Sequence, residues 1–466
     1  MTIETFRAEL GDIPVEDHPR IVQQRSRDHY WYSPVLKAKL DHVTADIVVS
    51  PRSTDEVCAV LAAAFRHGVP ITPRGAGTGN YGQAMPLSGG AILNLMSMDK
   101  VLDIRPDRVR AEAGAIMEKI DHETRAAVGG ELRFHPSTYR MASIGGFIAG
   151  GSGGVGSVRW GGLRNLGSIL GLKVVTCEAE PRVLDLDGED IMKVAHAYGT
   201  NGIIVEAEMP LTTAYDWVDM IVGFDDFIAA CRFGQDVALQ DGLLVKEVAP
   251  CAAPIPEAYF TRHRPYIRDG QSVVLLMVAP VAVAAMTLFV AHHGGEMLYR
   301  SDLAGEEEKR KLPPVYELAW NHTTLRALKV DPTITYLQTR YPSIAHLEKI
   351  IAIFGDELPV HLEITRQDGV VTLSGLPLVR YTTEERLEEI IRIHEENDCD
   401  VFNPHRYTLE EGGMKRTNQA QLDFKRDADP KGILNPGKMV AWEDPNFDFN
   451  AGRAWLFDGL NPVRAA

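Results

Sequence analysis

The sequence is poor in cysteine, in positive charge and in long uninterrupted hydrophobic runs. Five cysteines occur in 466 residues and none are spaced C-x-x-C, which argues against a disulfide framework and a zinc cluster. With 48 Lys and Arg against 64 Asp and Glu, the formal charge of −16 disfavours nucleic acid and anionic lipid as partners. The first 30 residues contain no signal-peptide pattern. We therefore expect a reduced, cytoplasmic protein.

One uncharged segment, residues 271–291, has the length of a membrane span. Its first half is rich in β-branched residues, Pro280 lies at its midpoint, and its second half is rich in alanine. Proline breaks the interior of a helix but is well tolerated in the first turn. The segment therefore predicts a buried strand followed by a helix, and no membrane span.

The remaining pattern predicts an α+β protein. Residues 46–72 have the periodicity of a β-α-β unit, and short strands follow, with helices expected at about 116–128 and 189–197. Beyond Trp217, strands alternate with helices in a pattern typical of a mainly antiparallel sheet with helices on one face.

Two glycine-rich zones, 74–82 and 145–162, interrupt this pattern. GTGNYG at 77–82 satisfies G-x-G-x-x-G, but no long helix is expected after it, so a Rossmann-type NAD site is excluded. Residues 150–154 satisfy G-x-S-x-G, again without a helix directly behind the serine, which argues against a serine hydrolase. Successive backbone N–H groups in such loops can instead bind a pyrophosphate; the alternative is that the glycines only serve tight turns.

Several motifs follow one another in order, including PITPRGAGTG at 70–79, SIGGFIAGGSGG at 143–154 and DPKGILNPGKM at 429–439. This series resembles the vanillyl-alcohol oxidase / p-cresol methylhydroxylase (PCMH-type) flavoprotein family, in its glycolate oxidase-like and D-lactate dehydrogenase-like branch. The resemblance implies a two-lobed FAD-binding domain at 42–215 and an α+β substrate (cap) domain at 216–414. It also implies that an N-terminal segment, 1–41, packs on the FAD-binding domain and that a C-terminal segment, 415–466, returns to it.

The resemblance implies FAD as the cofactor and assigns residues to it. Those expected at the FAD are Pro73, Arg74, Gly75, Ala76, Gly77, Thr78, Gly79, Asn80 and Tyr81, then Pro136, Ser137, Ser143, Gly145, Gly146, Gly150, Ser152 and Gly153, and finally Ile203, Ile204, Asn435 and Lys438. Asn80 and Tyr81 stand where many relatives carry a flavin-attaching histidine, so we expect noncovalent FAD. The H-x-G-D-G-N-x-H string of the metal-assisted members is absent, so no metal is expected.

Candidate catalytic residues come from strand alternation in the cap, whose sheet is implied to cover the flavin. In VHLEIT, one strand face is expected to carry His361, Glu363 and Thr365. In TITYLQTR, one strand face is expected to carry Ile334, Tyr336, Gln338 and Arg340. His405 and Tyr407 are expected on one strand face just before Glu411. A histidine suits the removal of a hydroxyl proton, so His405 is the first choice, with Tyr407 sharing the role and Arg340 binding a carboxylate. The alternative for each is a structural role.

The sequence therefore predicts an FAD-dependent oxidoreductase that takes hydride from a small alcohol, hydroxy acid or similar polar donor. Oxygen, a quinone or a protein would accept the electrons. Two alternatives remain: a nonenzymatic FAD-binding interaction module and an NADPH-dependent flavin reductase. Assembly into a homo-oligomer is a further possibility, because residues 273–291 are apolar and the C-terminal tail carries Trp442, Phe447, Phe449, Trp455 and Phe457.

Overall fold

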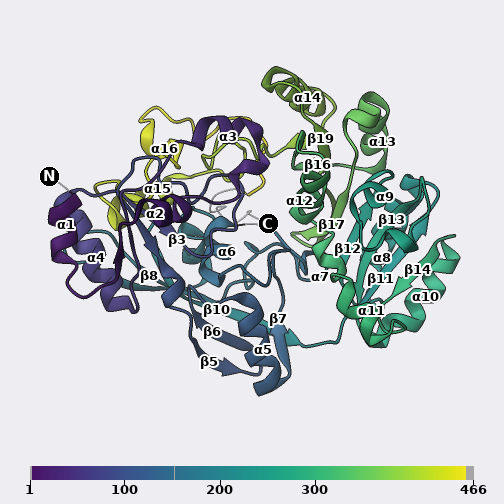
Figure 1. The fold of residues 1–466 in the computed structure, drawn as a ribbon, viewed down its shortest axis with the longest axis horizontal. Coiled ribbons are helices and arrows are strands. Elements are labelled where there is room, and N and C mark those ends of the chain that lie inside the picture. Colours follow the sequence, from purple (N-terminus) through teal and green to yellow (C-terminus); the bar gives the residue numbers. More distant parts are fainter. Residues whose placement is uncertain (1–2, 152, 458–466) are drawn as a thin grey trace.

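The computed structural model describes residues 3–151 and 153–457, which form two lobes lying side by side (Figure 1). The first lobe contains the chain through β10 (Ile203–Thr213) together with the C-terminal segment. The second lobe is built from the residues between them. In Figure 1 the purple and yellow ends of the chain therefore share one lobe, and the green second lobe is inserted between them in sequence.

A four-stranded sheet forms one half of the first lobe, in the order β1 (Val15–Glu16), β2 (Ile47–Val49), β4 (Ala91–Asn94), β3 (Ile71–Arg74). The strands β2, β4 and β3 are parallel. Between β2 and β3, α4 (Thr54–His67) is capped by the Ser53 side chain and ends at Gly68, which has φ +65°. The β-α-β unit read from the sequence is present.

A second, antiparallel sheet completes the first lobe, in the order β5 (Val101–Arg105), β6 (Arg108–Glu112), β10, β8 (Gly171–Val175), β9 (Val183–Leu186), with β7 (Gly130–Leu132) also paired to β10. The predicted helix at 116–128 is α5 (Met117–Val128). The predicted helix at 189–197 is wrong in type and length, because the structure has a 3₁₀ helix, η3 (Gly188–Lys193). His196 and Tyr198 follow it with φ of +51°, which no helix accommodates.

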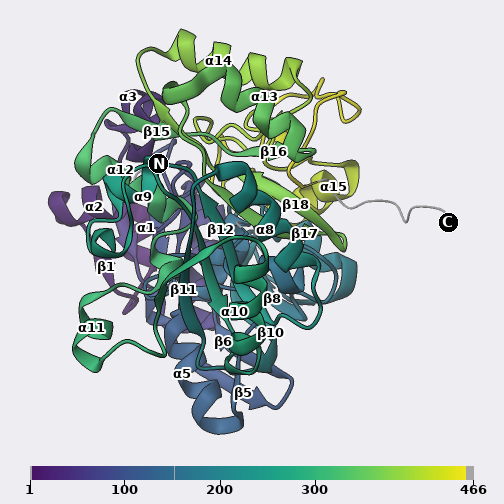
Figure 2. The ribbon, with the colours of Figure 1, turned by 90° about the vertical axis from the view of Figure 1, so that its right-hand side faces the viewer.

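The second lobe contains a two-stranded sheet and two four-stranded antiparallel sheets. The orders of the four-stranded sheets are β12 (Val245–Cys251), β13 (Ser272–Val278), β11 (Val218–Phe224), β14 (Glu296–Arg300), and β17 (Leu362–Gln367), β18 (Val370–Gly375), β16 (Thr339–Tyr341), β20 (Asp400–Val401). The helices α8 (Phe227–Leu239), α13 (Ile344–Phe354) and α14 (Glu384–Glu396) share one apolar core with these sheets (Figure 2). On the opposite face of β13 lies α9 (Ile255–Tyr259), and α12 (Asn321–Val330) packs against α9. Helices thus cover both faces of the first of these sheets.

The uncharged segment 271–291 divides as the sequence predicts. Its first part is β13, whose seven residues are all buried, and its second part is η5 (Pro280–Ala282) followed by α10 (Val283–His292). Within the described residues, no helix is both long and apolar enough to cross a membrane.

Two predicted strands of the second lobe are not single strands. TITYLQTR splits into β15 (Ile334–Tyr336), paired with β19 (Leu378–Arg380), and β16, which belongs to another sheet. Ile334, Tyr336, Gln338 and Arg340 therefore do not share one strand face. Likewise β20 ends at Val401, and the chain through His405 and Tyr407 forms turns, so the expected alternation does not apply there.

The C-terminal segment packs back on the first lobe. The backbone N–H of Ile71 donates to Ile433 O, and the N–H of Asn435 donates to Ile71 O. The helices of this segment are α15 (Gln419–Ala428) and α16 (Val440–Glu443). The aromatic residues Trp442, Phe447 and Phe449 pack with Tyr198 and Leu409 of the same chain.

Candidate functional site

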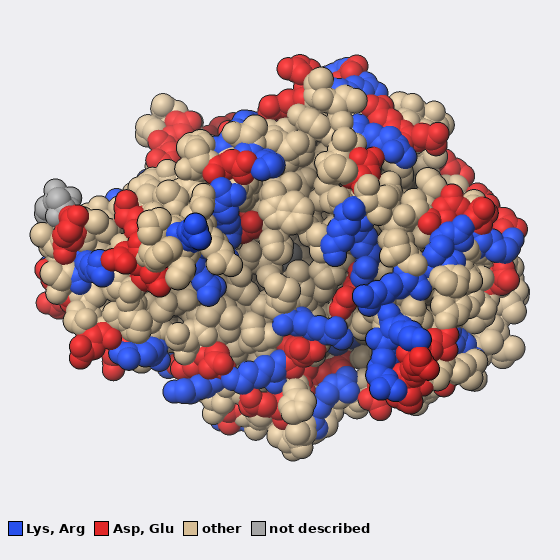
Figure 3. Space-filling view, in the orientation of Figure 1, with Lys and Arg blue, Asp and Glu red and all other residues tan. Residues whose placement is uncertain are grey.

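A deep cleft of about 1070 Å³ opens between the two lobes. The glycine-rich zones of the first lobe line one side, and β16, β17 and β18 of the second lobe line the other. Met414 and, from the C-terminal segment, Arg416, Leu456 and Phe457 also line the cleft. Figure 3 shows this hollow near the centre of one face, with Lys and Arg side chains close to its rim. The volume lies just above the roughly 300–1,000 Å³ range of small-molecule and cofactor sites.

The first glycine-rich loop lines the cleft with all of its predicted residues, Pro73, Arg74, Gly75, Ala76, Gly77, Thr78, Gly79, Asn80 and Tyr81. Glycine is required at two of these positions. A Cβ at Gly75 would overlap the Ser143 hydroxyl, and Gly77 has φ +71° with the Arg74 guanidinium packed against its Cα. The two glycine zones are therefore in direct contact, and both present backbone to the same space.

The second zone differs from the expectation of a helix-free loop. It contains α6 (Ile144–Gly150), which begins directly after Ser143, and the Ser143 hydroxyl accepts a bond from Ala76 N at 3.4 Å. A Cβ at Gly145 would overlap Ala113. The predicted residues Pro136, Ser137, Ser143, Gly145, Gly146, Gly150 and Gly153 line the cleft, as do Ile203 and Ile204. Ser152 lies outside the described residues.

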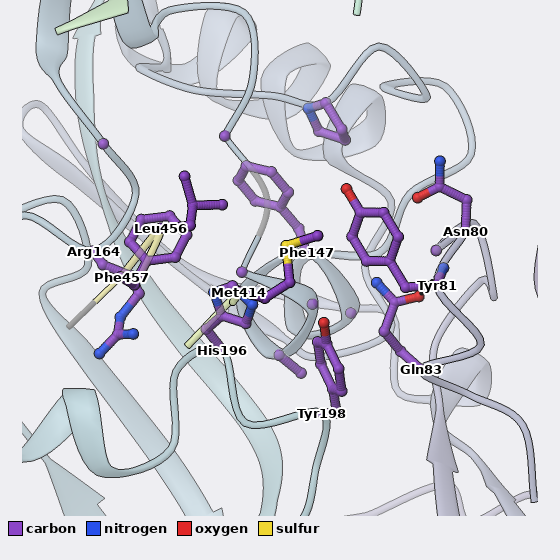
Figure 4. A pocket seen from close by; sticks show the side chains of 18 of the residues that line it. Asn80, Tyr81, Gln83, Phe147, Arg164, His196, Tyr198, Met414, Leu456 and Phe457 are labelled. Atoms are coloured by element: carbon purple, nitrogen blue, oxygen red, sulfur yellow. Dashed lines mark hydrogen bonds between the residues drawn. The ribbon is translucent and has the colours of Figure 1, made fainter. Parts of the chain in front are cut away.

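The polar groups of the cleft floor indicate a ligand. Both ring nitrogens of His196 and the hydroxyl of Tyr198 are buried and have no hydrogen-bond partner within the described residues. Buried polar groups normally find partners, so these atoms fit a site that a polar ligand completes. Figure 4 shows Tyr81, Tyr198 and Met414, from three separate parts of the chain, gathered around this space. The glycine cradle, the size of the cleft and these atoms fit the predicted FAD.

Asn435 and Lys438 do not line the cleft, which corrects their predicted place at the flavin edge. The Asn435 Nδ2 donates to Gln83 O at 2.8 Å and to Tyr198 O at 2.7 Å, and the Lys438 Nζ donates to Gly82 O at 2.6 Å. Both side chains therefore fix the end of the first loop from behind. Burial lowers the pKa of Lys438 to about 7, although Asp28 opposes this shift, and burial raises the pKa of Asp28 to about 6.

Among the predicted catalytic residues, Arg340 lines the cleft and His405, Tyr407, His361, Glu363 and Glu411 do not. His405 is 1 % exposed, its Nδ1 lies 2.6 Å from Ser33 Oγ and its Nε2 lies 2.9 Å from Tyr336 O. Its expected position at the flavin is wrong, because both ring nitrogens are engaged away from the cleft. Tyr407 packs under the Lys438 ammonium, and Glu411 accepts the Thr408 hydroxyl at 2.8 Å.

His361 and Glu363 lie behind the cleft wall, next to Glu247, and all three are buried. Glu363 Oε1 accepts the backbone N–H of Trp320 at 2.5 Å, and Glu247 Oε2 accepts the indole N–H of Trp320 at 3.2 Å. Burial raises the pKa of both carboxyls, and for Glu363 the charge of Glu247 adds to the effect. The two carboxyls share Trp320 as a hydrogen-bond donor, and their raised pKa values favour the protonated form. Trp320 itself lines the cleft beside Gly153.

Several cleft residues were not predicted from the sequence. They are Asp28, Tyr32, Gln83, Phe147, Arg164, His196, Tyr198, Trp320, Asn321, His322, Phe402, Met414, Arg416, Leu456 and Phe457. They come from turns and segment ends far apart in the chain, where no periodic pattern marks a site. The positive φ of His196 and Tyr198 is a property of the folded backbone that their residue types do not announce.

Residues 45–185 match the family model described as an FAD binding domain. The matched segment is an FAD-binding domain of the PCMH type. The domain is 31% identical over 175 residues to the glycolate oxidase subunit GlcD of Bacillus subtilis, an alignment that covers 36% of this chain and 37% of that protein. It is also 32% identical over 165 residues to the D-lactate dehydrogenase of Archaeoglobus fulgidus, covering 35% of each. The chain thus spans little more than a third of these curated relatives.

Other comparisons extend beyond the FAD-binding domain. A probable mitochondrial D-lactate dehydrogenase of Danio rerio is 28% identical over 483 residues, which cover 95% of this chain and 92% of that protein. The solved structure of an alkyldihydroxyacetonephosphate synthase matches with a TM-score of 0.71 over 94% of this chain and 85% of that chain, at 16% identity. At that identity the match shows the fold alone, with the second lobe in the position of a cap.

Proposed function

We propose that the protein is an FAD-dependent oxidoreductase that oxidises a small polar donor carrying a CH–OH group. One observation carries this proposal: a single cleft has the glycine cradle of the FAD-binding domain on one wall and polar residues of the cap sheets on the other. Bound FAD would supply a two-electron acceptor at that place. The protein residues would then bind the donor, orient it and take up its proton.

The charged residues of the cleft favour an anionic donor. Those lining it are Arg74, Arg164, Arg340, Arg366, Arg416 and Arg453 on the positive side and Asp28, Glu189 and Asp368 on the negative side. The cleft is therefore lined by more positive than negative residues, although the whole chain has a formal charge of −16. The relatives named glycolate oxidase and D-lactate dehydrogenase support the same class, a 2-hydroxy acid, for this chain.

Arg340 is the cap residue best placed to bind a donor carboxylate. Its Nε donates to Asp400 Oδ2 at 2.9 Å, its Nη2 also contacts Asp400, and Nη1 has no hydrogen-bond partner within the described residues. The guanidinium lies over the Phe402 ring at 5.6 Å. A guanidinium fixed in this way loses little freedom when it binds a carboxylate.

Noncovalent attachment of FAD is part of the proposal. The first loop presents Asn80 and Tyr81 to the cleft, and the Tyr81 hydroxyl is bonded to Gln338. Acid precipitation of the purified protein should therefore leave the yellow colour in the supernatant. A yellow pellet would contradict noncovalent attachment.

An anaerobic screen of hydroxy acids, alcohols and amines for bleaching of the bound flavin tests the proposed function. We expect a 2-hydroxy acid to bleach it, and readmitted air then separates an oxidase from a dehydrogenase. Bleaching by NADPH alone would identify a flavin reductase, and flavin that no donor bleaches would identify a binding module. A protein that neither contains nor binds FAD would overturn the proposal.

A further inference from the structure

Two histidines line the cleft within the part of the chain that the structure describes, His196 and His322. His196 belongs to the FAD-binding domain, is 2 % exposed, lies against Gly151 and meets the Phe457 ring edge to face. His322 belongs to the cap, in the first turn of α12, and is half-buried. Figure 1 shows α12 on the side of the cap that faces the FAD-binding domain. His322 is therefore the cleft histidine on the donor side.

The ring of His322 is free to accept a proton. It makes no hydrogen bond within the described residues, unlike the ring of His405. Burial lowers the pKa of His322 to about 4, helped by Arg326 and Lys329 of the same helix and by His29 of the N-terminal segment. The imidazole is consequently neutral at physiological pH, with a lone pair available.

The start of α12 is held by an unusual clamp. Trp320, directly before the helix, has φ +53°, which is costly for a bulky residue. The buried Glu363 binds its backbone N–H and the buried Glu247 binds its indole N–H, so both polar hydrogens of one residue are taken by one carboxyl pair. This pair fixes where the helix begins and therefore where His322 stands.

We propose that His322 is the catalytic base of the donor oxidation and that Glu247 and Glu363 are positioning residues that act on it through Trp320. The inference rests on the proposed function. The donor O–H bond breaks and its proton goes to an imidazole nitrogen of His322. With FAD bound as the two-electron acceptor, the donor C–H bond would break, its hydrogen would leave with both electrons to FAD, and the carbon would become a carbonyl. The imidazolium returns its proton to water after the product leaves.

Substitution of His322 tests the catalytic part. We expect His322→Ala to slow anaerobic flavin bleaching by the donor found in the screen by about 10²- to 10⁴-fold, the usual worth of a general base. FAD affinity, followed by flavin fluorescence, should stay unchanged, and added imidazole should restore part of the rate. The matched control is His292→Gln, because His292 lies exposed at the end of α10, outside the cleft. It should bleach at the wild-type rate.

The outcomes separate this inference from the proposed function. If no donor bleaches the flavin of the wild-type protein, both the proposed function and the base assignment are overturned. Wild-type protein that is bleached, with His322→Ala bleached equally fast, would overturn the base assignment and leave the proposed function intact. A slow His322→Ala variant with weakened FAD binding and no response to imidazole would also count against it, because the residue would then be structural.

Substitution of Glu363 tests the positioning part. Glu363→Leu removes the acceptor for Trp320 N–H, whereas Glu363→Gln keeps an oxygen there and can donate to Glu247. We expect a slow rate in the first variant and a largely restored rate in the second. As a readout without donor, the ¹³C-labelled ring signals of His322, identified by their loss in His322→Gln, should move in Glu363→Leu and return in Glu363→Gln. Unmoved signals, or equal rates in the two variants, would overturn the clamp.

Discussion

Asp121 shows how the interior of the FAD-binding domain sets the protonation of one side chain. It is 3 % exposed, its Oδ1 accepts the Leu132 N–H at 2.6 Å, and its Oδ2 accepts the Tyr139 hydroxyl at 2.9 Å. Burial raises its pKa to about 6, against the opposing effects of Lys246 and these hydrogen bonds. The folded protein therefore holds a proton on Asp121 at pH values where the unfolded chain has lost it.

This proton makes the stability of the protein depend on pH in a defined direction. A carboxyl whose folded pKa is raised contributes stability that is complete below about pH 4, its unfolded pKa, and is lost as the pH rises through about 6. Asp121→Asn removes the titration; its Oδ1 can still accept the Leu132 N–H, and its Nδ2 can donate to the Tyr139 hydroxyl oxygen in place of the present bond. Relative to wild type, we expect the variant to gain stability between pH 4 and pH 6, by up to roughly 2–3 kcal/mol. Urea unfolding at several pH values measures the difference, and a gain that falls with rising pH would refute it.

The positions of single residues were predicted well where a sequence motif determines them and poorly where tertiary packing determines them. The run from Pro73 to Tyr81 lines the cleft as predicted. It could be predicted because close backbone contact with a ligand requires glycine, and glycines can be read from the sequence. His405 was misplaced because strand alternation was extended past Val401, where the chain turns. His322 carries no sequence signal, since only the packing of α12 brings it to the cleft.

At the scale of elements, the close contact of α6 with its neighbours shapes the cofactor site. The N–H of Gly145 donates to Ala113 O at 2.8 Å, and a Cβ on Gly145 would come within 2.6 Å of the Ala113 Cβ. Most strands and helices were predicted correctly because their periodicity is regular. The helix α6 was not, because IGGFIAG contains three glycines and no polar face, so tertiary packing and not propensity makes it helical.

Gly145→Ala should push α6 away from β6 and distort the cradle. We expect FAD affinity to fall at least tenfold and the free energy of unfolding to fall by roughly 1–3 kcal/mol, as for overpacking in a core. Gly242→Ala is the control, because a Cβ there meets no atom within 4 Å and φ is not in the left-handed region. Flavin fluorescence titration and urea unfolding measure the two effects. Wild-type FAD affinity in Gly145→Ala would contradict the described contact.

At the scale of the whole molecule, a buried ion pair joins the two lobes. Lys246 of β12 in the cap lies 2.9 Å from Glu131 of β7 in the FAD-binding domain, and both side chains are at most 2 % exposed. The indole N–H of Trp217 donates to the same Glu131 oxygen at 2.7 Å. The arrangement in two lobes was inferred from the family resemblance. The ion pair between Lys246 and Glu131 could not be predicted from the sequence, because its partners are 115 residues apart.

Lys246→Met removes the buried cation but leaves Glu131 paired with Arg125 and bonded to Trp217, so the cost should stay below the about 3–5 kcal/mol of leaving a buried charge without any partner. Lys39→Met is the matched control, because the pair of Lys39 with Glu384 also crosses between the lobes at 3.3 Å but both side chains are 42% exposed. Its loss should cost less than about 1 kcal/mol. Guanidinium unfolding of both variants tests this contrast. Equal costs would show that the buried pair does not hold the lobes together.

The order of segments along the chain governs when the cofactor site can exist. Asn435 and Lys438 fix the first glycine loop, and Leu456 and Phe457 line the cleft, yet the entire cap is synthesised before any of them. A nascent chain that has left the ribosome only as far as the cap has both glycine zones but lacks the residues that brace one of them. We therefore expect flavin to load only after residues 435–457 have emerged.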